Sequence, residues 1–348
     1  MSTVLLTGSQ GFIATYICCE LLNNGYQVIG VDDFSKYGQV IRPQDNHPNF
    51  LFDQVDIVKN YVHLENLVYH YKPKYIISCA AKIGGIAYFN EHSYEILHDN
   101  EAIMSNVCDA AIYAHKSYGL KRFINISSSM VFEQTKIYPT PETEINNCSP
   151  PLSSYGFQKL ATEYWTRELY RSFKIPYTII RPFNAVGAFE DEAKDEKIIM
   201  SGNIKLMMSH VLPDYVNKSL KKQSPFRILG TGKQIRHLTN GKDIAHAIRL
   251  AMESDKAINE DFNISHSEPI NMLDLAKRVW EKVNPIKEFI YELEPGYEFD
   301  VQVRSPSVEK AKNLLGFEAK ISIDQSIDEV VNYIKTKEER NIQKYSNL

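Results

Sequence analysis

The sequence has no long apolar stretch, no excess of basic charge and no cysteine pattern typical of a metal site. No run approaches the roughly 18 uninterrupted apolar residues that a membrane-spanning helix requires. A formal net charge of −4 gives no electrostatic reason to bind nucleic acid or an anionic membrane. The five cysteines include no CxxC pair, so we expect no metal, and their odd number favours mostly buried thiols in a reducing compartment. The partner class that remains is a small molecule.

The first residues also lack the features of a secretory signal. Met1-Ser2-Thr3 leads directly into Val4-Leu5-Leu6-Thr7-Gly8, without a basic segment, a long apolar segment and a small-residue cleavage site. We therefore expect a cytoplasmic protein. Its 348 residues are enough for two structural units or for one domain with a large insertion.

In the first half of the chain, short apolar runs alternate with helical patterns. One such helix, Phe12 to Leu22, is followed by the stop signal Asn23-Asn24-Gly25. This rhythm is typical of βαβ units, so we expect an α/β protein with a Rossmann-type, doubly wound parallel sheet. The predicted strands are Val4–Thr7, Gln27–Val31, Tyr75–Cys79, Phe123–Ser127 and Tyr177–Arg181.

The pattern changes after Arg181. A polar loop occupies 188–203 and a helical pattern covers 209–221, which indicates a smaller C-terminal α/β lobe. Segments 238–253 and 261–264 again read as a helix and a strand, and they could return to the main sheet. We therefore expect a larger unit of 1–185 plus about 236–265, and a discontinuous lobe of 186–235 plus 266–334. The highly charged segment 335–348 is predicted to be a polar tail that frays in solvent.

The segment Thr7-Gly8-Ser9-Gln10-Gly11-Phe12-Ile13-Ala14 lies directly after a predicted strand and before a predicted helix. In this position Gly8 permits a tight turn, Gly11 lets the backbone approach a pyrophosphate, and Ala14 allows the helix to pack closely on the strand. An ordinary glycine-rich turn is the alternative. The context and the acid that follows about 20 residues later favour a dinucleotide site.

That acid is Asp32, at the end of the second predicted strand, where a carboxylate can accept hydrogen bonds from ribose hydroxyls and would repel a 2′-phosphate. We therefore predict NAD rather than NADP, although Lys36 points weakly the other way. Asp33 could also be a loop acid. Downstream, Asp56-Ile57 could flank the adenine amine, while Asp56 alone would fit a helix cap as well.

Tyr155 and Lys159 are four residues apart, so they share one face of the helix predicted around them. A phenol is a poor base at neutral pH, but a nearby ammonium and a nicotinamide cation would both lower its pKa. Tyr155 could then take the proton of a sugar hydroxyl as hydride leaves the carbon. Alone, the pair could equally be a half-buried tyrosine and a solvated lysine.

These motifs, in this order and spacing, resemble those of the extended short-chain dehydrogenase/reductases, in particular the NAD-dependent epimerases and dehydratases of nucleotide sugars, such as UDP-glucose 4-epimerases. The resemblance extends from about residue 3 to about residue 330. It rests on the glycine turn, Asp32, Asp56-Ile57, Ser127-Ser128-Ser129-Met130-Val131-Phe132, Tyr155 with Lys159, Arg181-Pro182-Phe183-Asn184-Ala185-Val186-Gly187, and the segments Gly230–Arg236 and Val308–Phe317.

The resemblance implies a role for each matched position. Ser128, Tyr155 and Lys159 would be catalytic. The cofactor would be NAD, held by Gly8, Gln10, Gly11, Phe12, Ile13, Asp32, Asp33, Asp56, Ile57, Ala80, Ala81, Lys82, Asn100, Ser127, Tyr155, Lys159 and Pro182. A nucleotide-diphosphate sugar would contact Lys82, Ser128, Met130, Asn184, His210, Val211, Arg236 and Arg304. His210 could instead be structural. The resemblance further implies a homodimer formed through a four-helix contact.

The residues after Ser128 bear on the reaction. The relatives that remove water across C4–C6 carry Asp-Glu there, the decarboxylating relatives carry a glutamate, and the 3,5-epimerases carry a cysteine at the position of Met130. Here Ser129-Met130 stands instead, and a thioether cannot exchange a proton. What remains is 4-epimerisation: oxidation at C4, rotation of the 4-keto sugar and return of the hydride from tightly bound NADH.

Two departures from the family pattern keep alternatives open. The 188–203 loop is unusual for a 4-epimerase, and Glu294-Pro295-Gly296-Tyr297 stands where relatives often have Arg-x-Gly-Asp. The segment Lys82-Ile83-Gly84-Gly85 even resembles that of 3,5-epimerases. The alternatives are a 4,6-dehydratase, a 3,5-epimerase or a 4-keto reductase on the same scaffold, and a protein that binds NAD without catalysis.

Overall fold

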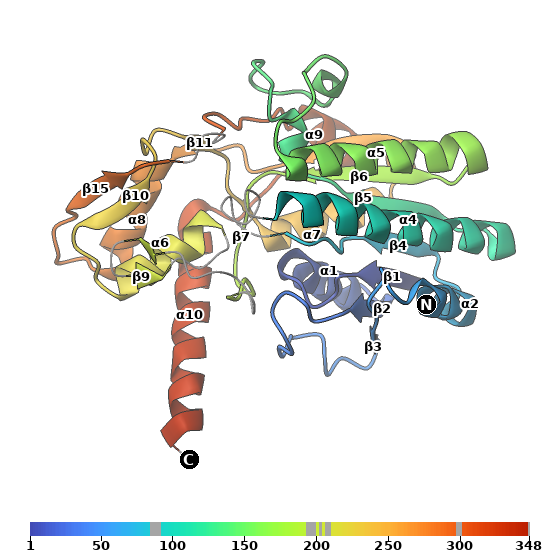
Figure 1. Cartoon of the computed structure of the whole chain (residues 1–348), viewed down its shortest axis with the longest axis horizontal. Coiled ribbons are helices and arrows are strands. Elements are labelled where there is room, and N and C mark those ends of the chain that lie inside the picture. Colours follow the sequence, from blue (N-terminus) through green and yellow to red (C-terminus); the bar gives the residue numbers. More distant parts are fainter. Residues whose placement is uncertain (84–91, 193–199, 202–203, 206–209, 297–300, 347–348) are drawn as a thin grey trace.

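The computed structural model describes residues 1–83, 92–192, 200–201, 204–205, 210–296 and 301–346. Its centre is a seven-stranded parallel sheet in the order β13-β6-β5-β4-β1-β2-β3 (Figure 1). The strands are β1 (Thr3–Thr7), β2 (Gln27–Asp32), β3 (Phe50–Gln54), β4 (Tyr75–Ser78), β5 (Arg122–Ile126), β6 (Tyr177–Pro182) and β13 (Glu260–Ile264). The predicted Rossmann-type sheet is thus confirmed, including the return of a strand near residue 261.

Helices cover both faces of the sheet, which is why its inner strands β4 and β5 are buried along their whole length. One face packs on α1 (Phe12–Asn23), α7 (Gly241–Glu253) and α9 (Glu309–Leu315). The other packs on α2 (Tyr61–Tyr71), α4 (Ser93–Tyr118) and α5 (Ser154–Phe173). Because β4 and β2 flank β1, the strand order reverses at β1, and ligands of such sheets bind at the carboxyl ends of the strands on either side of that point.

A second group of elements lies at one end of the sheet (Figure 1) and has its own apolar core. Leu212, Phe226, Leu275, Trp280 and Ile327 are among its buried residues. The elements are β7 (Ala185–Val186), β8 (Met200–Ser201), β9 (Ile204–Lys205), α6 (Val211–Leu220), β10 (Phe226–Leu229), β11 (Ile235–Arg236), β12 (Thr239–Asn240), β14 (Ile270–Asn271), α8 (Met272–Val283), β15 (Tyr291–Glu294) and α10 (Ile323–Ser346).

Short 3-10 helices complete the described elements: η1 (Ser129–Phe132), η2 (Glu142–Asn146) and η3 (Asp255–Ala257). The prediction of a frayed tail from residue 335 is wrong, because α10 continues through Ser346. Its apolar residues Ile327, Val330, Val331 and Ile334 pack into the second core and nucleate a helix that the polar residues prolong.

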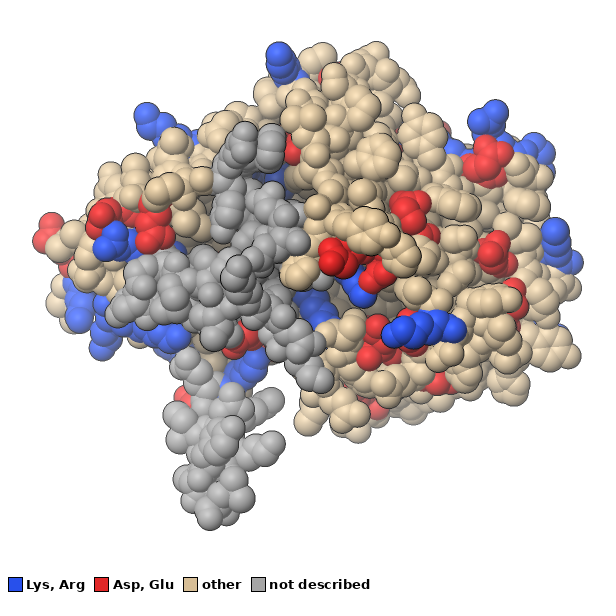
Figure 2. All heavy atoms as spheres, in the orientation of Figure 1, with Lys and Arg blue, Asp and Glu red and all other residues tan. Residues whose placement is uncertain are grey.

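The surface agrees with a near-neutral composition. On the face drawn in Figure 2, acidic and basic side chains are interspersed among uncharged ones. Within the described ranges, no helix is both long and apolar enough to cross a bilayer. The five cysteines are free; Cys18 and Cys108 are buried, and the other three are partly buried.

Candidate active site

The glycine turn between β1 and α1 is tight and closely packed. The Gly8 amide donates to the Val31 carbonyl over 2.8 Å, and Gly8 has φ +71°, a conformation that favours glycine. A Cβ on Gly8 would lie 2.8 Å from the Ala80 Cα. At the start of α1, Gly11 is the N-cap and no side chain caps the helix, which leaves the first-turn amides suited to an anion.

Asp32 holds this turn in place. Its Oδ2 accepts from the Gln10 amide over 3.0 Å and its Oδ1 accepts from the Phe34 amide over 2.8 Å. Burial raises the pKa of Asp32, and these two hydrogen bonds act against that rise. Asp33 accepts from the Ser35 amide over 2.9 Å, which is the loop role that the sequence left open.

Asp56 likewise contacts residues close to it in its own loop. It accepts from the Val58 and Lys59 amides and forms a 2.9 Å ion pair with the Lys59 ammonium. Burial would raise its pKa, but the contacts with Lys59 and Val58 outweigh it and lower the pKa of Asp56. The neighbouring Ile57 is buried, and its carbonyl accepts from Asn106 over 2.8 Å. Neither observation tests the predicted contact with adenine.

The segment after β4 is fixed from two sides. The Thr7 hydroxyl accepts from the Cys79 and Ala80 amides, each over 3.0 Å, which draws the segment against the glycine turn. The Asn100 side chain accepts from the Lys82 amide over 2.6 Å and donates to the Lys82 carbonyl over 3.0 Å. Asn100 therefore supports the backbone here. The Lys82 ammonium pairs with Asp99 on α4, and Gly84–Ile86 lie outside the described residues.

The residues present fit a dinucleotide. Beside the open helix start, three buried side-chain oxygens close to the turn have no hydrogen-bond partner: Ser9 Oγ, Gln10 Oε1 and Gln44 Oε1. Gln44 reaches the turn by donating to the Ser9 carbonyl over 3.0 Å, and the Arg42 Nε donates to the Gln10 carbonyl over 3.0 Å. Polar atoms that are buried without a partner are costly unless a ligand supplies one.

Ser128 and Tyr155 meet at the carboxyl ends of β5 and β6. Ser128 acts on the Tyr155 hydroxyl so as to lower its pKa, and the Ser128 hydroxyl accepts from the Met130 amide over 3.2 Å. Burial raises the pKa of Tyr155 to about 12, while Ser128 and Arg304 act to lower it. The Arg304 guanidinium thus acts electrostatically on the Tyr155 phenol.

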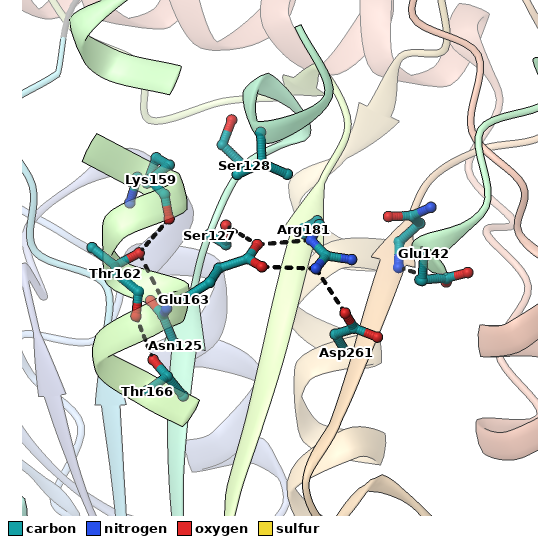
Figure 3. Close-up of polar contacts among 12 residues, drawn as sticks. Asn125, Ser127, Ser128, Glu142, Lys159, Thr162, Glu163, Thr166, Arg181 and Asp261 are labelled. Atoms are coloured by element: carbon teal, nitrogen blue, oxygen red, sulfur yellow. Dashed lines mark hydrogen bonds and ion pairs between the residues drawn. The ribbon is translucent and has the colours of Figure 1, made fainter. Parts of the chain in front are cut away.

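Lys159 is buried one helical turn beyond Tyr155 and donates to the Ile126 carbonyl over 2.8 Å. Burial lowers the pKa of Lys159 to about 8. Ser127, one of the residues predicted to hold the cofactor, donates to Glu163 over 2.7 Å, and Glu163 is paired with Arg181 (Figure 3). The end of β5 is thus held by two consecutive turns of α5.

The surroundings of the Tyr155 ring are apolar. Ile96 and Met130 pack on it as buried residues, with Ile83 and Val301 partly buried beside them. Met130 therefore lies against Tyr155. It contributes a thioether, which is no proton donor or acceptor of use.

The other predicted substrate residues belong to the segments between the sheet and the second core. Asn184, with φ +42°, donates to the His237 carbonyl over 3.1 Å, and Arg236 Nη1 donates to the Ile235 carbonyl over 2.9 Å. His210 precedes α6, which begins at Val211 as predicted, and it contacts Glu190 through Nδ1 over 2.5 Å. Pro182 ends β6 opposite Ile264.

Sequence reasoning missed two buried charge pairs near the site. Arg42 is paired with Asp191 over 3.0 Å, and Arg181 is paired with Glu163 over 2.7 Å. The second pair had a signal: Glu163 lies on the helical face of Tyr155 and Lys159, and Arg181 is the charged residue of the predicted strand Tyr177–Arg181. Nothing in the sequence indicated the first pair, because Asp191 lies in a charge-rich stretch that reads as solvated.

A sequence profile of the NAD dependent epimerase/dehydratase family matches residues 4–265. UDP-glucuronic acid decarboxylase 4 of Arabidopsis thaliana is 27% identical over 93% of this chain, which spans 66% of that relative's length. GDP-mannose 3,5-epimerase of the same plant is 24% identical over 99% of this chain and 85% of the relative.

Two solved structures are similar to this chain in fold. UDP-glucose 4-epimerase of Thermotoga maritima, in complex with UDP-glucose, superposes with a TM-score of 0.79 at 27% identity and covers 96% of this chain and 99% of its own. UDP-glucuronic acid 4-epimerase of Bacillus cereus, in complex with UDP-glucuronic acid and NAD, has a TM-score of 0.78 at 23% identity, with coverage of 96% and 99%.

Proposed function

The chain belongs to the NAD-dependent epimerase/dehydratase family, and within that family we propose that it is a nucleotide-diphosphate-sugar 4-epimerase. Members of the family are NAD-dependent epimerases, dehydratases and decarboxylases of nucleotide sugars. The choice among these reactions rests on the side chains around Tyr155.

NAD is the cofactor of this family. The glycine turn, the start of α1 and Asp32 would hold its dinucleotide, with Asp56-Ile57 at the adenine and the segment Ala80-Ala81-Lys82 along its other side. When bound, it accepts a hydride from the sugar carbon and gives it back. The protein must hold the sugar, exclude water and move one proton.

Tyr155 moves that proton. Ser128 acts on the Tyr155 hydroxyl, so a sugar hydroxyl placed between the two side chains would give its proton to Tyr155 while Ser128 orients the oxygen. The buried Lys159 ammonium and the Arg304 guanidinium favour the phenolate. After the keto sugar has rotated in the site and presents its other face to the cofactor, the same phenol returns the proton.

The observation that carries the proposal is the apolar wall of Ile96, Met130, Ile83 and Val301 around Tyr155. Dehydration, 3,5-epimerisation and decarboxylation need an acid or base at a neighbouring sugar carbon. The nearby thiol, Cys79, is unsuited to that task because burial raises its pKa to about 11. Inversion at C4 needs only Tyr155.

The substrate would lie between the two parts of the chain. We propose that 1–185 with 236–265 binds the cofactor, and that 186–235 with 266–334 binds the nucleotide and its diphosphate. Asn184, His210, Val211 and Arg236 would contact the nucleotide end, and Lys82, Met130 and Arg304 the sugar end. Basic side chains and helix starts are the usual donors to a diphosphate.

We further propose a cytoplasmic homodimer that associates through α4 and α5. These helices lie side by side (Figure 1). Their surface exposes large aromatic side chains, and contact with a second copy of the chain would remove this apolar area from water. Phe157 and Tyr164 of α5 are 49% and 69% exposed, on the face opposite Tyr155.

Arg304 favours a second candidate, decarboxylation of a nucleotide-linked uronic acid. A guanidinium that acts on Tyr155 could also pair with a carboxylate at C6 of the sugar. The Arabidopsis relative named for that reaction matches most of this chain. Against it, neither of the two residues directly after Ser128, Ser129 and Met130, is a glutamate.

The test is product analysis. Purified protein with its bound NAD is incubated with UDP-, GDP-, CDP- and dTDP-hexoses and UDP-glucuronic acid, and products are identified by NMR. We expect 4-epimers to interconvert without added reductant, and Tyr155→Phe to lower the rate by about 10³-fold. A 4-keto-6-deoxy sugar, a pentose or net consumption of NADH would refute 4-epimerisation in favour of dehydration, decarboxylation or reduction.

A further inference from the structure

The inner face of α5 carries a continuous row of functional groups. Tyr155, Lys159, Glu163 and Arg167 are each one turn apart, and the first three are buried. The proposed mechanism uses only the first two. Glu163 is 0% exposed, and a carboxylate is not placed in such a site without compensating partners.

Those partners join three elements. Glu163 Oε1 accepts from the Ser127 hydroxyl at the end of β5 over 2.7 Å. Both of its oxygens accept from Arg181 on β6, each over 2.7 Å. Arg181 also donates to Asp261 on β13 over 2.7 Å. Figure 3 shows Glu163 between Ser127 and Arg181, with Asp261 on the far side of the guanidinium.

The contact with Ser127 reaches the catalytic residues directly. Ser127 precedes Ser128, and the carbonyl before it, that of Ile126, accepts from the Lys159 ammonium over 2.8 Å. Two consecutive turns of α5 therefore hold two consecutive residues, Ile126 at the end of β5 and Ser127 directly after it, immediately before Ser128. We propose that Glu163 is a positioning residue of the reaction, which fixes the strand end that carries Ser128 against the helix that carries Tyr155 and Lys159.

The charge of Glu163 also acts on Lys159. Burial lowers the pKa of Lys159, whereas Cys79 beyond β4 and Glu163 of α5 raise it. Arg181 and Asp261 lie beyond Glu163, and two further cations, Arg167 and Lys310, face Asp261. Because Glu163 carries the negative charge nearest to Lys159 in this row, loss of that charge would let Lys159 lose its proton at lower pH.

The first test separates positioning from stability, and it rests on the proposed function because it measures turnover. In Ser127→Ala the hydroxyl that Glu163 holds is removed while all charges stay. We expect kcat to fall about 10-fold with KM almost unchanged, because only the reacting geometry is disturbed. Ser127→Thr, which keeps a hydroxyl, should restore most of kcat.

Asp261→Asn is the matched control. It removes a carboxylate from the same Arg181 but does not touch β5, so it should lower the melting temperature and leave kcat within about twofold of wild type. If Ser127→Ala has wild-type kcat, or loses no more than Asp261→Asn, Glu163 serves stability alone and the inference is wrong.

The second test needs no sugar. In protein made with isotope-labelled lysine, NMR of the side-chain Cε follows the titration of Lys159, identified by its loss in Lys159→Met. We expect Glu163→Gln to lower the titration midpoint by about one pH unit. An unchanged midpoint would overturn the inference. Failure of the wild type to convert any nucleotide sugar would count against the proposed function, not against this result.

Discussion

At the scale of single residues, the proposed catalytic role of Lys159 and the stability of the fold make opposite demands on its charge. An ammonium that is 7% exposed loses most of its hydration, and burial therefore lowers the pKa of Lys159 to about 8. The unfolded chain binds this proton more tightly than the folded one. The buried charge thus destabilises the fold below pH 8, and the penalty is relieved as the pH rises from about 8 toward the unfolded value of about 10.4.

Lys159→Met should therefore stabilise the protein while it abolishes turnover. At pH 7 we expect the free energy of unfolding to rise by about 2 kcal/mol. The difference from wild type should shrink as the pH approaches 10. Urea unfolding at pH 7 and pH 10 measures both values. A variant less stable than wild type at pH 7 would show that the hydrogen bond to the Ile126 carbonyl outweighs desolvation.

Gly8 and Gly25 provide a matched pair of glycines, since both have positive φ, +71° and +80°. Alanine at Gly25 meets no atom within 4 Å, whereas at Gly8 its Cβ would lie 2.8 Å from the Ala80 Cα. We expect Gly25→Ala to cost about 1 kcal/mol and to leave NAD binding unchanged.

Gly8→Ala should cost more than Gly25→Ala and weaken NAD binding by at least about 10-fold, because the turn must move away from β4. Calorimetric titration with NAD and thermal melts of both variants check this. Equal behaviour of the two variants would mean that the close approach to Ala80 does not shape the cofactor site.

At the scale of elements, the strand-helix rhythm of the first half was predictable because each element carries its own signal. Apolar runs bounded by turn residues gave β1, β2, β4, β5 and β6, and the return of β13 followed from the same pattern. Among the elements that were missed, two show why. The β3 strand, Phe50–Gln54, lies at the sheet edge with half-exposed side chains, and α4 mixes polar residues into its buried face.

The candidate site was predictable where a motif specifies a backbone shape or a helical face, as at Gly8, Tyr155 and Lys159. It was not predictable where residues far apart in sequence meet only through the fold. Asp191 is the clearest example. It is buried against Arg42 over 3.0 Å and also accepts from Tyr333 and Lys337 of α10, over 2.9 and 2.7 Å. No local pattern contains that information.

The contacts of Asp191 predict that two substitutions here differ greatly in how much they lower the free energy of unfolding. Asp191→Asn leaves the buried Arg42 without its countercharge and should lower the free energy of unfolding by about 3 kcal/mol. Lys337→Met removes a partner whose side chain is 45% exposed and should cost less than about 1 kcal/mol. Urea unfolding of both variants gives the comparison, and similar losses would show that Arg42 finds another partner.

At the scale of the whole molecule, the proposed dimer follows from the difference between the two faces of α5. Its inner face carries Tyr155, Lys159 and Glu163, and its outer face exposes Phe157 and Tyr164. Light scattering should give a mass twice the 40.0 kDa of the chain. Tyr164→Arg should shift this toward the monomer, because a charge in an apolar contact is costly.

Tyr69→Arg is the control, since Tyr69 is 65% exposed on α2, which is not one of the two helices of the proposed contact. It should leave the mass unchanged. A Tyr164→Arg protein that remains dimeric, or a wild type that is monomeric, would contradict this assembly.

The central claim is that the protein inverts one carbon, C4, using Tyr155 as its only proton-transfer group. The most direct measurement follows hydrogen at each sugar carbon when the reaction runs in deuterium oxide, with a substrate that carries deuterium at C4 in a parallel run in ordinary water. The account predicts that the C4 deuterium is retained in the epimer and that no carbon acquires deuterium from solvent, because no C–H proton is exchanged with water. Solvent deuterium at C3, C5 or C6 would contradict it and identify a second acid-base step.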